Sequence, residues 1–448
     1  MSAAAPGAAP VPQWPGSAAV TAPATVPVPA APPTPAGRVP LATVPGDRAP
    51  GRALDRATAV VACVCVGFWT QLAVGLTLGL LVAVLLTPVW LPVWWRYRTG
   101  RLLLGLAVAA VLCGAYLTLA GAGTRAPDPY GARLTASGVA VVVTSAGVLV
   151  WAHRVLAPRT VVVLYGAGML ASALPRAAGS TDPWKYELSV PVTVLVLGAC
   201  LTVSSVLVQV VAVLALAAVS AANDARSGAS LLVVTAAVLV WQRAAGALAP
   251  RSTVTRTVVQ LALLGVIAAF SIQAMLVEGV FGESARARTQ AQIDTSGFVL
   301  AGARPEMGAT AALLGAQPWG YGSGLLPDHG DVLTAKAGMA QLRYDPDNGY
   351  VERYLFGSGF EVHSVLGDLW IRLGPPGAVL AVTVTGLAAA GLVRALARRQ
   401  ASALRVLVTS LVAWDLLFSP FFSTSIAVMV LAVALAVTDS RTVGRAPP

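Results

Sequence analysis

Long apolar runs separated by short polar segments dominate this chain. Runs of 17 to 20 residues with few charges recur along it, and about 20 apolar residues suffice for a helix to cross a bilayer. The alternating ten-residue segments of a membrane barrel are not seen. The pattern therefore predicts an all-α polytopic membrane protein. About twelve transmembrane helices are expected, near residues 57–70, 74–95, 102–120, 135–152, 160–175, 188–202, 204–221, 229–242, 257–277, 376–393, 403–418 and 422–437.

Composition agrees with this fold class. Of the 448 residues 56% are hydrophobic and 11% are charged, and a soluble protein of this size would carry roughly twice that charge. Since the first apolar run begins near residue 57, no cleavable signal peptide is expected. The four cysteines lie inside apolar spans, so neither a disulfide framework nor a metal cluster is predicted.

The polar segments divide the chain unevenly. The first 52 residues contain 13 of the 31 prolines and few bulky apolar side chains, which predicts a disordered tail. One later segment of nearly 90 residues is far longer than the other loops and contains aromatic residues and glycine turns, so we expect it to fold. The predicted parts are a cytoplasmic tail at 1–52, helices one to nine at 53–277, a large extracytoplasmic loop carrying the catalytic motifs at 278–375, helices ten to twelve at 376–437 and a cytoplasmic tail at 438–448.

The distribution of charge predicts the orientation. With the N-terminus in the cytoplasm, the inner segments hold 18 of the 30 basic residues against three acidic ones, and the outer segments hold 12 basic and 15 acidic residues. Basic residues favour the cytoplasmic side and the anionic lipids there. The net charge of +11 thus indicates a multi-pass protein of the cell membrane with both termini inside and lipids as partners. Nucleic acid binding is not implied.

The three histidines occur in different surroundings. His153 follows a predicted span beside an arginine, where a helix C-terminus favours a cation. His329 lies in the turn-like stretch LPDHGD, as an exposed surface residue would. His363 lies in GFEVHSVLGDLWIRLGPPG, just before a short amphipathic segment and a membrane span. A neutral imidazole at that surface could accept a proton from a substrate; the alternative is a structural hydrogen bond.

Three arginines are expected on the same outer face. Arg226 lies in the turn NDARSGAS, Arg304 opens a predicted helix in the large loop, and Arg372 follows His363 by nine residues. A guanidinium binds phosphate oxygens in bidentate fashion. Each arginine alone could contact a lipid headgroup, but together with a histidine they favour a phosphorylated lipid.

Carboxylates suggest less. Asp345 and Asp347 in RYDPDNGY resemble a metal-binding pair, but the proline, asparagine and glycine beside them favour a turn. Asp415 lies inside a predicted span, where a carboxylate is either functional or hydrogen bonded to another helix. No phosphate-binding loop, zinc motif or nucleophile elbow is present. No metal and no cofactor is predicted.

Together these segments resemble the O-antigen ligase and O-antigen polymerase superfamily of membrane glycosyltransferases. NDARSGASLL is similar to the family's arginine turn, and AGARPEMGATAALLGAQPWGYGSG to the start of its large external loop, with glycines at Gly320, Gly322 and Gly324. VHSVLGDLWIRLGPPGAVL is similar to its histidine segment. About twelve spans with one long outer loop, between the ninth and the tenth, agree with the family's topology.

The resemblance implies a metal-independent, inverting transfer of a glycan from undecaprenyl diphosphate to an acceptor hydroxyl on a glycan, a lipid or a wall polymer. His363 would be the general base, and Arg226, Arg304 and Arg372 would bind the diphosphate. Asp368 could orient the imidazole, and Asp415 is a further supporting candidate. Ligase and polymerase remain open. A polysaccharide or lipid-linked glycan transporter or flippase is the alternative, although no internal symmetry of the two halves supports it.

Overall fold

A computed structural model describes residues 50–249, 251–279, 283, 286–287, 289–290, 304–357 and 359–439. The predicted tails at 1–52 and 438–448 and part of the large loop therefore lie mostly outside the described residues. The described chain is mostly helical, and one two-stranded hairpin is its only sheet. The class of an all-α fold is thus confirmed for this part of the chain.

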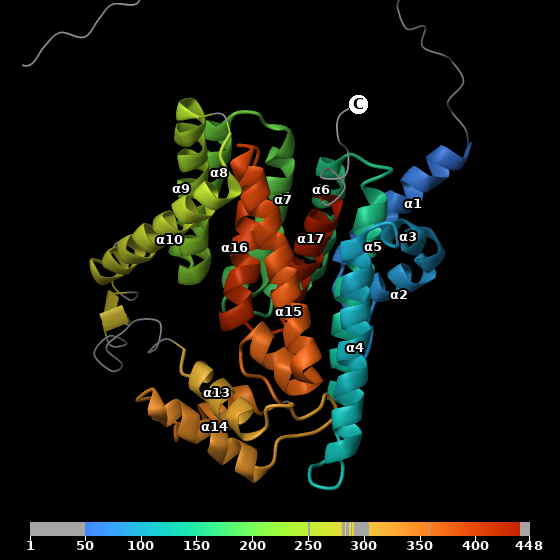
Figure 1. Ribbon diagram of the computed structural model, residues 1–448, viewed down its shortest axis with the longest axis vertical. Coiled ribbons are helices and arrows are strands. Elements are labelled where there is room, and N and C mark those ends of the chain that lie inside the picture. The colour runs from blue at the N-terminus through green and yellow to red at the C-terminus, as the bar shows by residue number, and fades with distance from the viewer. Residues whose placement is uncertain are drawn as a thin grey trace, which may run out of the picture. The chain divides into compact units, whose positions relative to one another are not determined.

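The first half of the chain forms helices α1 to α9, with a hairpin after α1 (Figure 1). The elements are α1 Pro50–Gly67, β1 Gln71–Ala73, β2 Leu76–Thr77, α2 Leu78–Leu85, α3 Thr87–Trp94, α4 Arg98–Gly121, α5 Pro129–Ala152, α6 Pro158–Ala177, the π-helix η1 Trp184–Leu188, α7 Ser189–Ala199, the 3-10 helix η2 Cys200–Thr202, α8 Val206–Ala222 and α9 Arg226–Leu248.

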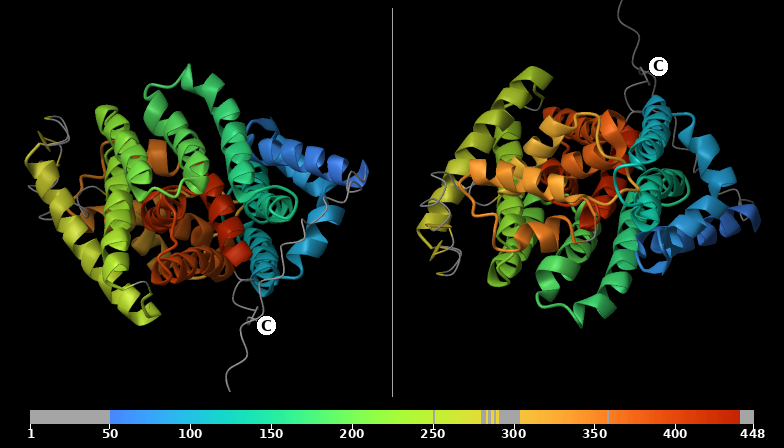
Figure 2. Two further views of the ribbon diagram at one scale, coloured as in Figure 1. Left: turned by 90° about the horizontal axis from the view of Figure 1, so that it is seen from above. Right: turned by 90° about the horizontal axis from the view of Figure 1, so that it is seen from below.

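The second half contains four long helices and a smaller group of short ones. The elements are α10 Val254–Val277, α13 Glu306–Ala316, α14 His329–Gln341, the π-helix η3 Val351–Leu355, α15 Val365–Ala397, α16 Ala403–Phe418 and α17 Thr424–Asp439. Seen along the bundle, α15 to α17 lie in the middle, with α8 to α10 on one side and α1 to α3 on the other (Figure 2).

Six helical segments of the described chain are long and apolar enough to cross a membrane: α4, α5, α6, the continuous stretch Trp184–Thr202, α9 and α15. Shorter apolar helices cover Val206–Ala222, Val254–Ile267 and Thr424–Thr438. The predicted division between the spans at 188–202 and 204–221 is present, because Ser205 caps α8 by accepting a hydrogen bond from the N–H of Val208.

The predicted span at 74–95 is not one helix. Gly75, with φ of +74°, turns the β1–β2 hairpin, and Thr77 caps α2 by accepting a hydrogen bond from the N–H of Leu80 at 3.1 Å. Pro88 lies in the first turn of α3 and separates it from α2. An eight-residue helix extends about 12 Å, so neither α2 nor α3 alone reaches across a hydrocarbon layer of about 30 Å.

Close helix contacts in the bundle depend on glycine. A Cβ on Gly67 of α1 would lie 2.2 Å from the carbonyl oxygen of Tyr165 in α6, and a Cβ on Gly168 of α6 would lie 2.0 Å from that of Val64. Small residues that let backbones approach are typical of helix pairs in membranes, where lipid is as apolar as the side chains.

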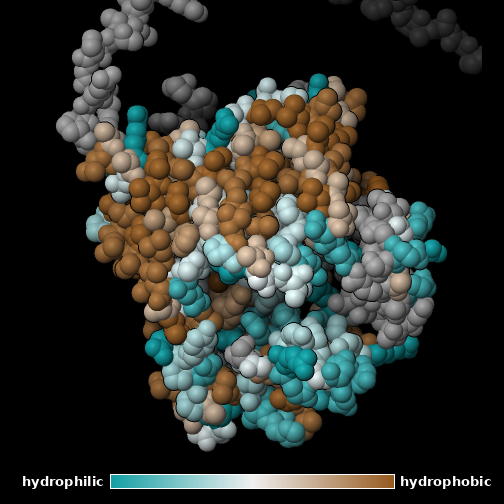
Figure 3. Space-filling view, turned by 180° about the vertical axis from the view of Figure 1, so that it is seen from behind, coloured by the Kyte–Doolittle hydropathy of each residue, from teal (hydrophilic) through white to brown (hydrophobic). Residues whose placement is uncertain are grey.

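Residues 304–364 form a separate small core at one end of the bundle; we call this segment the lobe, and that end the lobe end. Its core includes Leu313, Met339, Leu355 and Phe360. Helices α13 and α14 cross closely, since a Cβ on Gly308 would lie 2.2 Å from the carbonyl oxygen of Gly338. Figure 3 shows an apolar band over the bundle, a hydrophilic lobe below it and a hollowed surface between the two.

An ion pair ties the lobe to the turn between α4 and α5. Arg125 donates from Nε and Nη2 to the two carboxylate oxygens of Asp331 at 2.8 and 2.9 Å. Both side chains are largely buried, and the Arg125 guanidinium lies 4.9 Å from the ring centre of Tyr321. Backbone pairing between Pro127 and Leu325 continues the contact.

The sequence Gly374-Pro375-Pro376 bends α15 and binds the lobe at the bend. Gly374 has φ of 67° and ψ of −167° inside the helix. Pro375 has no N–H to donate to the carbonyl of Ile371, and that oxygen accepts instead from the N–H groups of Tyr321 and Gly322 at 2.7 and 3.3 Å. The predicted span at 376–393 is the part of α15 beyond this bend.

Candidate functional site

His363 occupies a strained position at the start of α15. Its φ is 54°, a left-handed conformation that is uncommon for a residue with a side chain and often found at functional sites. The next residue, Ser364, caps α15: its hydroxyl accepts from the N–H of Gly367 at 3.1 Å and donates to the carbonyl of Leu416 at 2.9 Å. The backbone that follows His363 is therefore fixed.

Asp368 holds this backbone. Among the described residues it forms no hydrogen bond with the imidazole of His363. The fully buried carboxylate accepts from the N–H of Val362 at 2.7 Å and from the N–H of Phe421 at 2.8 Å. It thus links the residue before His363 to the turn between α16 and α17. The predicted role of orienting the ring directly is replaced by one of orienting the chain.

The imidazole itself has one nitrogen without a partner. Nδ1 of His363 is buried and has no hydrogen-bond partner among the described residues. Its ring lies 6.3 Å from the ring of Tyr350, at 37°. The aromatic neighbour comes from the lobe, so α15 and the lobe enclose the histidine between them.

Tyr350 connects His363 to a carboxylate and an arginine. Its hydroxyl donates to Oε1 of Glu306 at 2.6 Å. Burial, followed by the charge of Glu306, raises the pKa of Tyr350, whereas the nearby guanidinium of Arg304 lowers it. Two residues predicted from sequence thus lie in the surroundings of Tyr350: His363 beside its ring and Arg304 near enough for its charge to affect the hydroxyl.

Arg304 lies on an aromatic platform. Its guanidinium carbon is 5.7 Å from the ring centre of Trp414 and 5.7 Å from that of Phe418, both on α16. Stacking on aromatic faces leaves the edge of a guanidinium available for bidentate hydrogen bonds. The side chain is positioned to bind an anion at the lobe end.

Glu306 is the site residue that sequence reasoning did not identify. Its side chain is 7% exposed, and Oε2 has no hydrogen-bond partner among the described residues. A buried carboxylate oxygen without a partner is costly. In the sequence, only its position pointed to it: Glu306 lies in ARPEMG, two residues after Arg304, and begins α13.

Arg226 lies at the same end of the bundle. Gln242 of α9 exchanges two hydrogen bonds of 3.0 Å with the backbone of Ala401, and α9 packs along α16. Arg226 precedes Gln242 by 16 residues and Phe418 follows Ala401 by 17 residues. If the two helices run antiparallel, each of these residues lies about 25 Å from the Gln242–Ala401 contact, toward the lobe end, at 1.5 Å per residue. Its Nη1 is 3.5 Å from Oγ1 of Thr289.

Arg372 is placed differently from the other two arginines. It is 4% exposed, donates from Nε to the carbonyl of Phe360 at 2.8 Å and from Nη1 to Oγ1 of Thr135 at 3.3 Å, and packs over Phe422. These contacts join α15 to α5, the lobe and the turn before α17. In this structure the Arg372 guanidinium is occupied by protein groups. It does not face an open site beside His363.

Asp415 is also buried, at 7% exposure, and forms side-chain hydrogen bonds with Ser419 and Ser425. These bonds hold the turn between α16 and α17, which Asp368 holds from its other side. The glycines of the WGYGSG run have a packing role too: a Cβ on Gly322 would lie 2.6 Å from the backbone nitrogen of Thr118 in α4.

The remaining candidates lie away from this cluster. His329 is exposed on the first turn of α14, as predicted. The cation predicted at His153 is wrong, because burial lowers the pKa of this histidine to about 4. The stretch from Asp345 to Asp347 is a turn in which Asp347 pairs with Lys336 at 2.9 Å. Among the described residues no group of three or more histidine, cysteine, aspartate or glutamate side chains could hold a metal ion.

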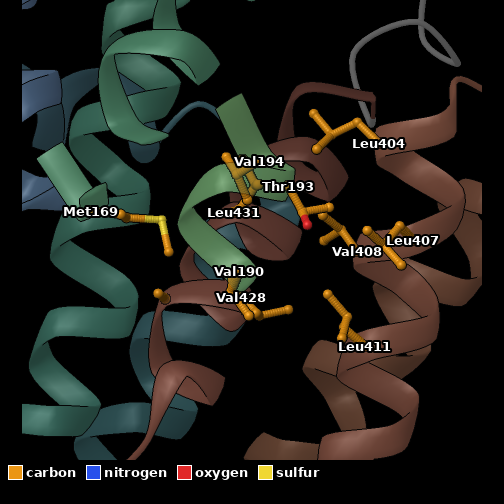
Figure 4. A pocket seen from close by; sticks show the side chains of 11 residues that line it. Met169, Val190, Thr193, Val194, Leu404, Leu407, Val408, Leu411, Val428 and Leu431 are labelled. Atoms are coloured by element: carbon orange, nitrogen blue, oxygen red, sulfur yellow. The ribbon is translucent and has the colours of Figure 1, made fainter. Parts of the chain in front are cut away.

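A gap between α6, α7, α16 and α17 contains none of the site residues. Aliphatic side chains point into it, and Thr193 is its one polar lining residue in the described chain (Figure 4). Such a lining offers nothing to bind a sugar or a diphosphate.

No protein-family model, no curated protein and no solved structure matches this chain. The arrangement of its own residues is therefore the basis for a function.

Proposed function

We propose that this protein is a glycosyltransferase of the cell membrane. It transfers a glycan from undecaprenyl diphosphate to an acceptor hydroxyl of a glycan, a lipid or a wall polymer, at the extracytoplasmic face. His363 is the general base, and Arg304 and Arg226 bind the diphosphate. The proposal rests on the resemblance of three segments to O-antigen ligases and polymerases and on the chemistry of the lobe end.

In the proposed topology the chain crosses the membrane about twelve times, with both termini in the cytoplasm and the lobe outside, between the ninth and tenth crossings. Helices α2 and α3 together make one bent crossing, since residues 78–94 extend about 25 Å. The apolar band and the hydrophilic lobe of Figure 3 support a bundle embedded in the membrane with the lobe in water, and the distribution of basic residues supports the lobe being outside.

The convergence of His363 and Arg304 on Tyr350 is the observation that carries the proposal. The two residues are 59 positions apart in the sequence, yet the imidazole of His363 lies 6.3 Å from the Tyr350 ring and the charge of Arg304 lowers the pKa of the Tyr350 hydroxyl. A structural histidine would be expected to satisfy its buried nitrogen by a hydrogen bond, and His363 does not in the described structure. A base next to an anion-binding arginine is what transfer from a diphosphate requires.

In the proposed step the acceptor oxygen attacks the anomeric carbon of the first sugar from the face opposite the diphosphate. The acceptor proton passes to His363, the new carbon–oxygen bond forms, and the bond from the anomeric carbon to the diphosphate oxygen breaks. Undecaprenyl diphosphate leaves with its negative charge held by Arg304 and Arg226. Asp368, Arg372 and Asp415 hold the backbone of the site.

The test uses a strain lacking the gene and compares the sizes of its lipid-linked and surface glycans after complementation. We expect His363→Ala and Arg304→Ala to fail to restore wild-type glycans. Two exposed residues of the lobe provide matched controls, His329→Ala and Arg353→Ala, which are expected to restore them.

The stranded glycan then identifies the reaction. Single repeats on lipid with loss of long surface chains indicate a polymerase, and full-length chains left on lipid indicate a ligase. If His363→Ala restores wild-type glycans at normal protein levels, the general base is wrong and transport of a lipid-linked glycan becomes the better explanation.

A further inference from the structure

Arg399, at the end of the bundle away from the lobe, belongs to a second cluster that the proposed reaction does not use. It follows α15 and has φ of 60°, a conformation that usually falls to glycine after a helix. The N–H of Arg399 donates to the carbonyl of Leu396 at 2.9 Å, and the N–H of Gln400 to that of Ala395 at 2.9 Å. These two hydrogen bonds fix the backbone of Arg399, and with it the direction in which the side chain leaves the helix end.

The side chain of Arg399 lies across α9. Its guanidinium carbon is 5.0 Å from the ring centre of Trp241. Its Cγ would be 3.7 Å from a Cβ on Gly246, so the aliphatic part passes over a glycine. The ring and the glycine together fix the plane of the guanidinium.

No described acidic side chain pairs with this guanidinium. Its Nε and Nη1 are buried and have no hydrogen-bond partner among the described residues. Burial and the neighbouring Arg256 lower the pKa of Arg399. The sequence contains no acidic residue at 225–277 or at 369–414, the stretches that form α9, α10 and the end of α15 with the start of α16. Two guanidinium nitrogens without a partner, next to another cation and with no carboxylate in these stretches, favour an anion that binds from outside the described part of the chain.

The surroundings select the kind of anion. Exposed apolar side chains flank the cluster on α9 and α10, including Leu248 at 90% exposure, Val254 at 53% and Val258 at 47%. A free anion would gain nothing from them, whereas acyl chains would cover them. Trp241 lies near the end of the apolar helix α9, beside Arg399. Tryptophan is enriched at this depth of a membrane protein, where the lipid headgroups lie.

We propose that Arg399, with Trp241 beneath it and Arg256 beside it, binds the phosphate of an anionic membrane lipid whose acyl chains lie along α9 and α10. The site requires only that the bundle is embedded in a membrane and is independent of the glycosyl transfer proposed above. It differs from general attraction to basic loops because one guanidinium is held in place by an aromatic ring.

The experiment measures lipid retention by native mass spectrometry on the full-length protein in detergent, titrated with phosphatidylglycerol. Phosphatidylcholine and inorganic phosphate serve as comparison ligands. Loss of a charge-assisted contact in Arg399→Gln is expected to weaken phosphatidylglycerol binding at least about tenfold. Arg256→Gln, on the exposed side of α10, is expected to weaken it as well and tests the site if Arg399→Gln does not fold.

Arg398→Gln is the matched control, since it removes the same charge from the adjacent, exposed position. Retention of phosphatidylglycerol by Arg398→Gln with loss in Arg399→Gln supports the site. Equal losses in the two variants would show that only the summed charge attracts lipid and would overturn it. Binding of inorganic phosphate that depends on Arg399, without a matching dependence for phosphatidylglycerol, would assign the site to a free anion and overturn the lipid.

Discussion

Replacement of Asp368 by alanine tests the scaffold of the candidate site without assuming a reaction. The carboxylate is fully buried and accepts two backbone hydrogen bonds, from Val362 at 2.7 Å and from Phe421 at 2.8 Å. Alanine would leave both N–H groups buried and unpaired. It would also remove the acidic group nearest to Arg372, whose charge Asp368 stabilises.

The expected loss follows from these contacts. A hydrogen bond to a charged group contributes about 1.5–3 kcal/mol net, so two give roughly 3–6 kcal/mol. Relief of the cost of burying the carboxylate offsets part of this. We therefore expect Asp368→Ala to lower the free energy of unfolding by about 3 kcal/mol, and the melting temperature by several degrees, at roughly 2 °C for each kcal/mol.

Thermal unfolding in detergent and glycan synthesis in the complemented strain measure the two consequences. Asp347→Ala removes a largely exposed carboxylate of the lobe and should shift the free energy of unfolding by less than about 0.5 kcal/mol. If the melting temperature of Asp368→Ala equals that of Asp347→Ala, the two N–H groups have found other acceptors, and Asp368 does not hold the histidine segment. A normal melting temperature with lost synthesis would instead indicate a direct role at His363.

Three further outcomes are expected. Glu306→Gln retains an acceptor for the Tyr350 hydroxyl but removes a buried charge with an unpaired oxygen, so the melting temperature should hold or rise; a lower melting temperature would show that the charge is paired. Arg125→Ala leaves the buried carboxylate of Asp331 without its bidentate partner, and hydrogen exchange should show the lobe opening more readily, by about 3 kcal/mol. His153 has a pKa lowered from 6.5 to about 4, so its neutral form contributes stability that is present above pH 6.5 and is lost as the pH falls toward 4. Relative to His153→Gln, the wild-type protein should lose up to about 3 kcal/mol between pH 7 and pH 4, and parallel acid profiles would contradict the burial of this ring.

The helices were predictable where one apolar run met one clear boundary. The predicted spans at 102–120, 135–152 and 160–175 lie within α4, α5 and α6, because proline or arginine opens each helix and a polar turn closes it. The stretch 74–95 was not predictable from hydropathy alone. Its hairpin depends on one positive φ at Gly75, a property that an apolar run does not reveal.

The site was predictable in its residue types and less so in its partners. His363 and Arg304 were chosen as candidates because one precedes a membrane span and the other opens a helix of the large loop. The role of Arg372 could not be read from spacing: nine residues after His363 it faces Phe360 and Thr135, and the second of these comes from α5. Glu306 gave little signal, since burial of a carboxylate is decided by the packing of the lobe and not by its neighbours in the sequence.

The charged segment before Gly374 has a common purpose in the folded protein. Asp368 and Arg372 form their hydrogen bonds with backbone and side-chain groups of other elements. The bend at Gly374 leaves the carbonyl of Ile371 to accept hydrogen bonds from the lobe. Each of these bonds fixes the chain on one side of His363, whose φ of 54° costs free energy that the fold must offset. Glycine would have no penalty at this positive φ. The hydrogen bonds of the buried Asp368 and Arg372 therefore hold the backbone in a conformation that a histidine alone would not favour.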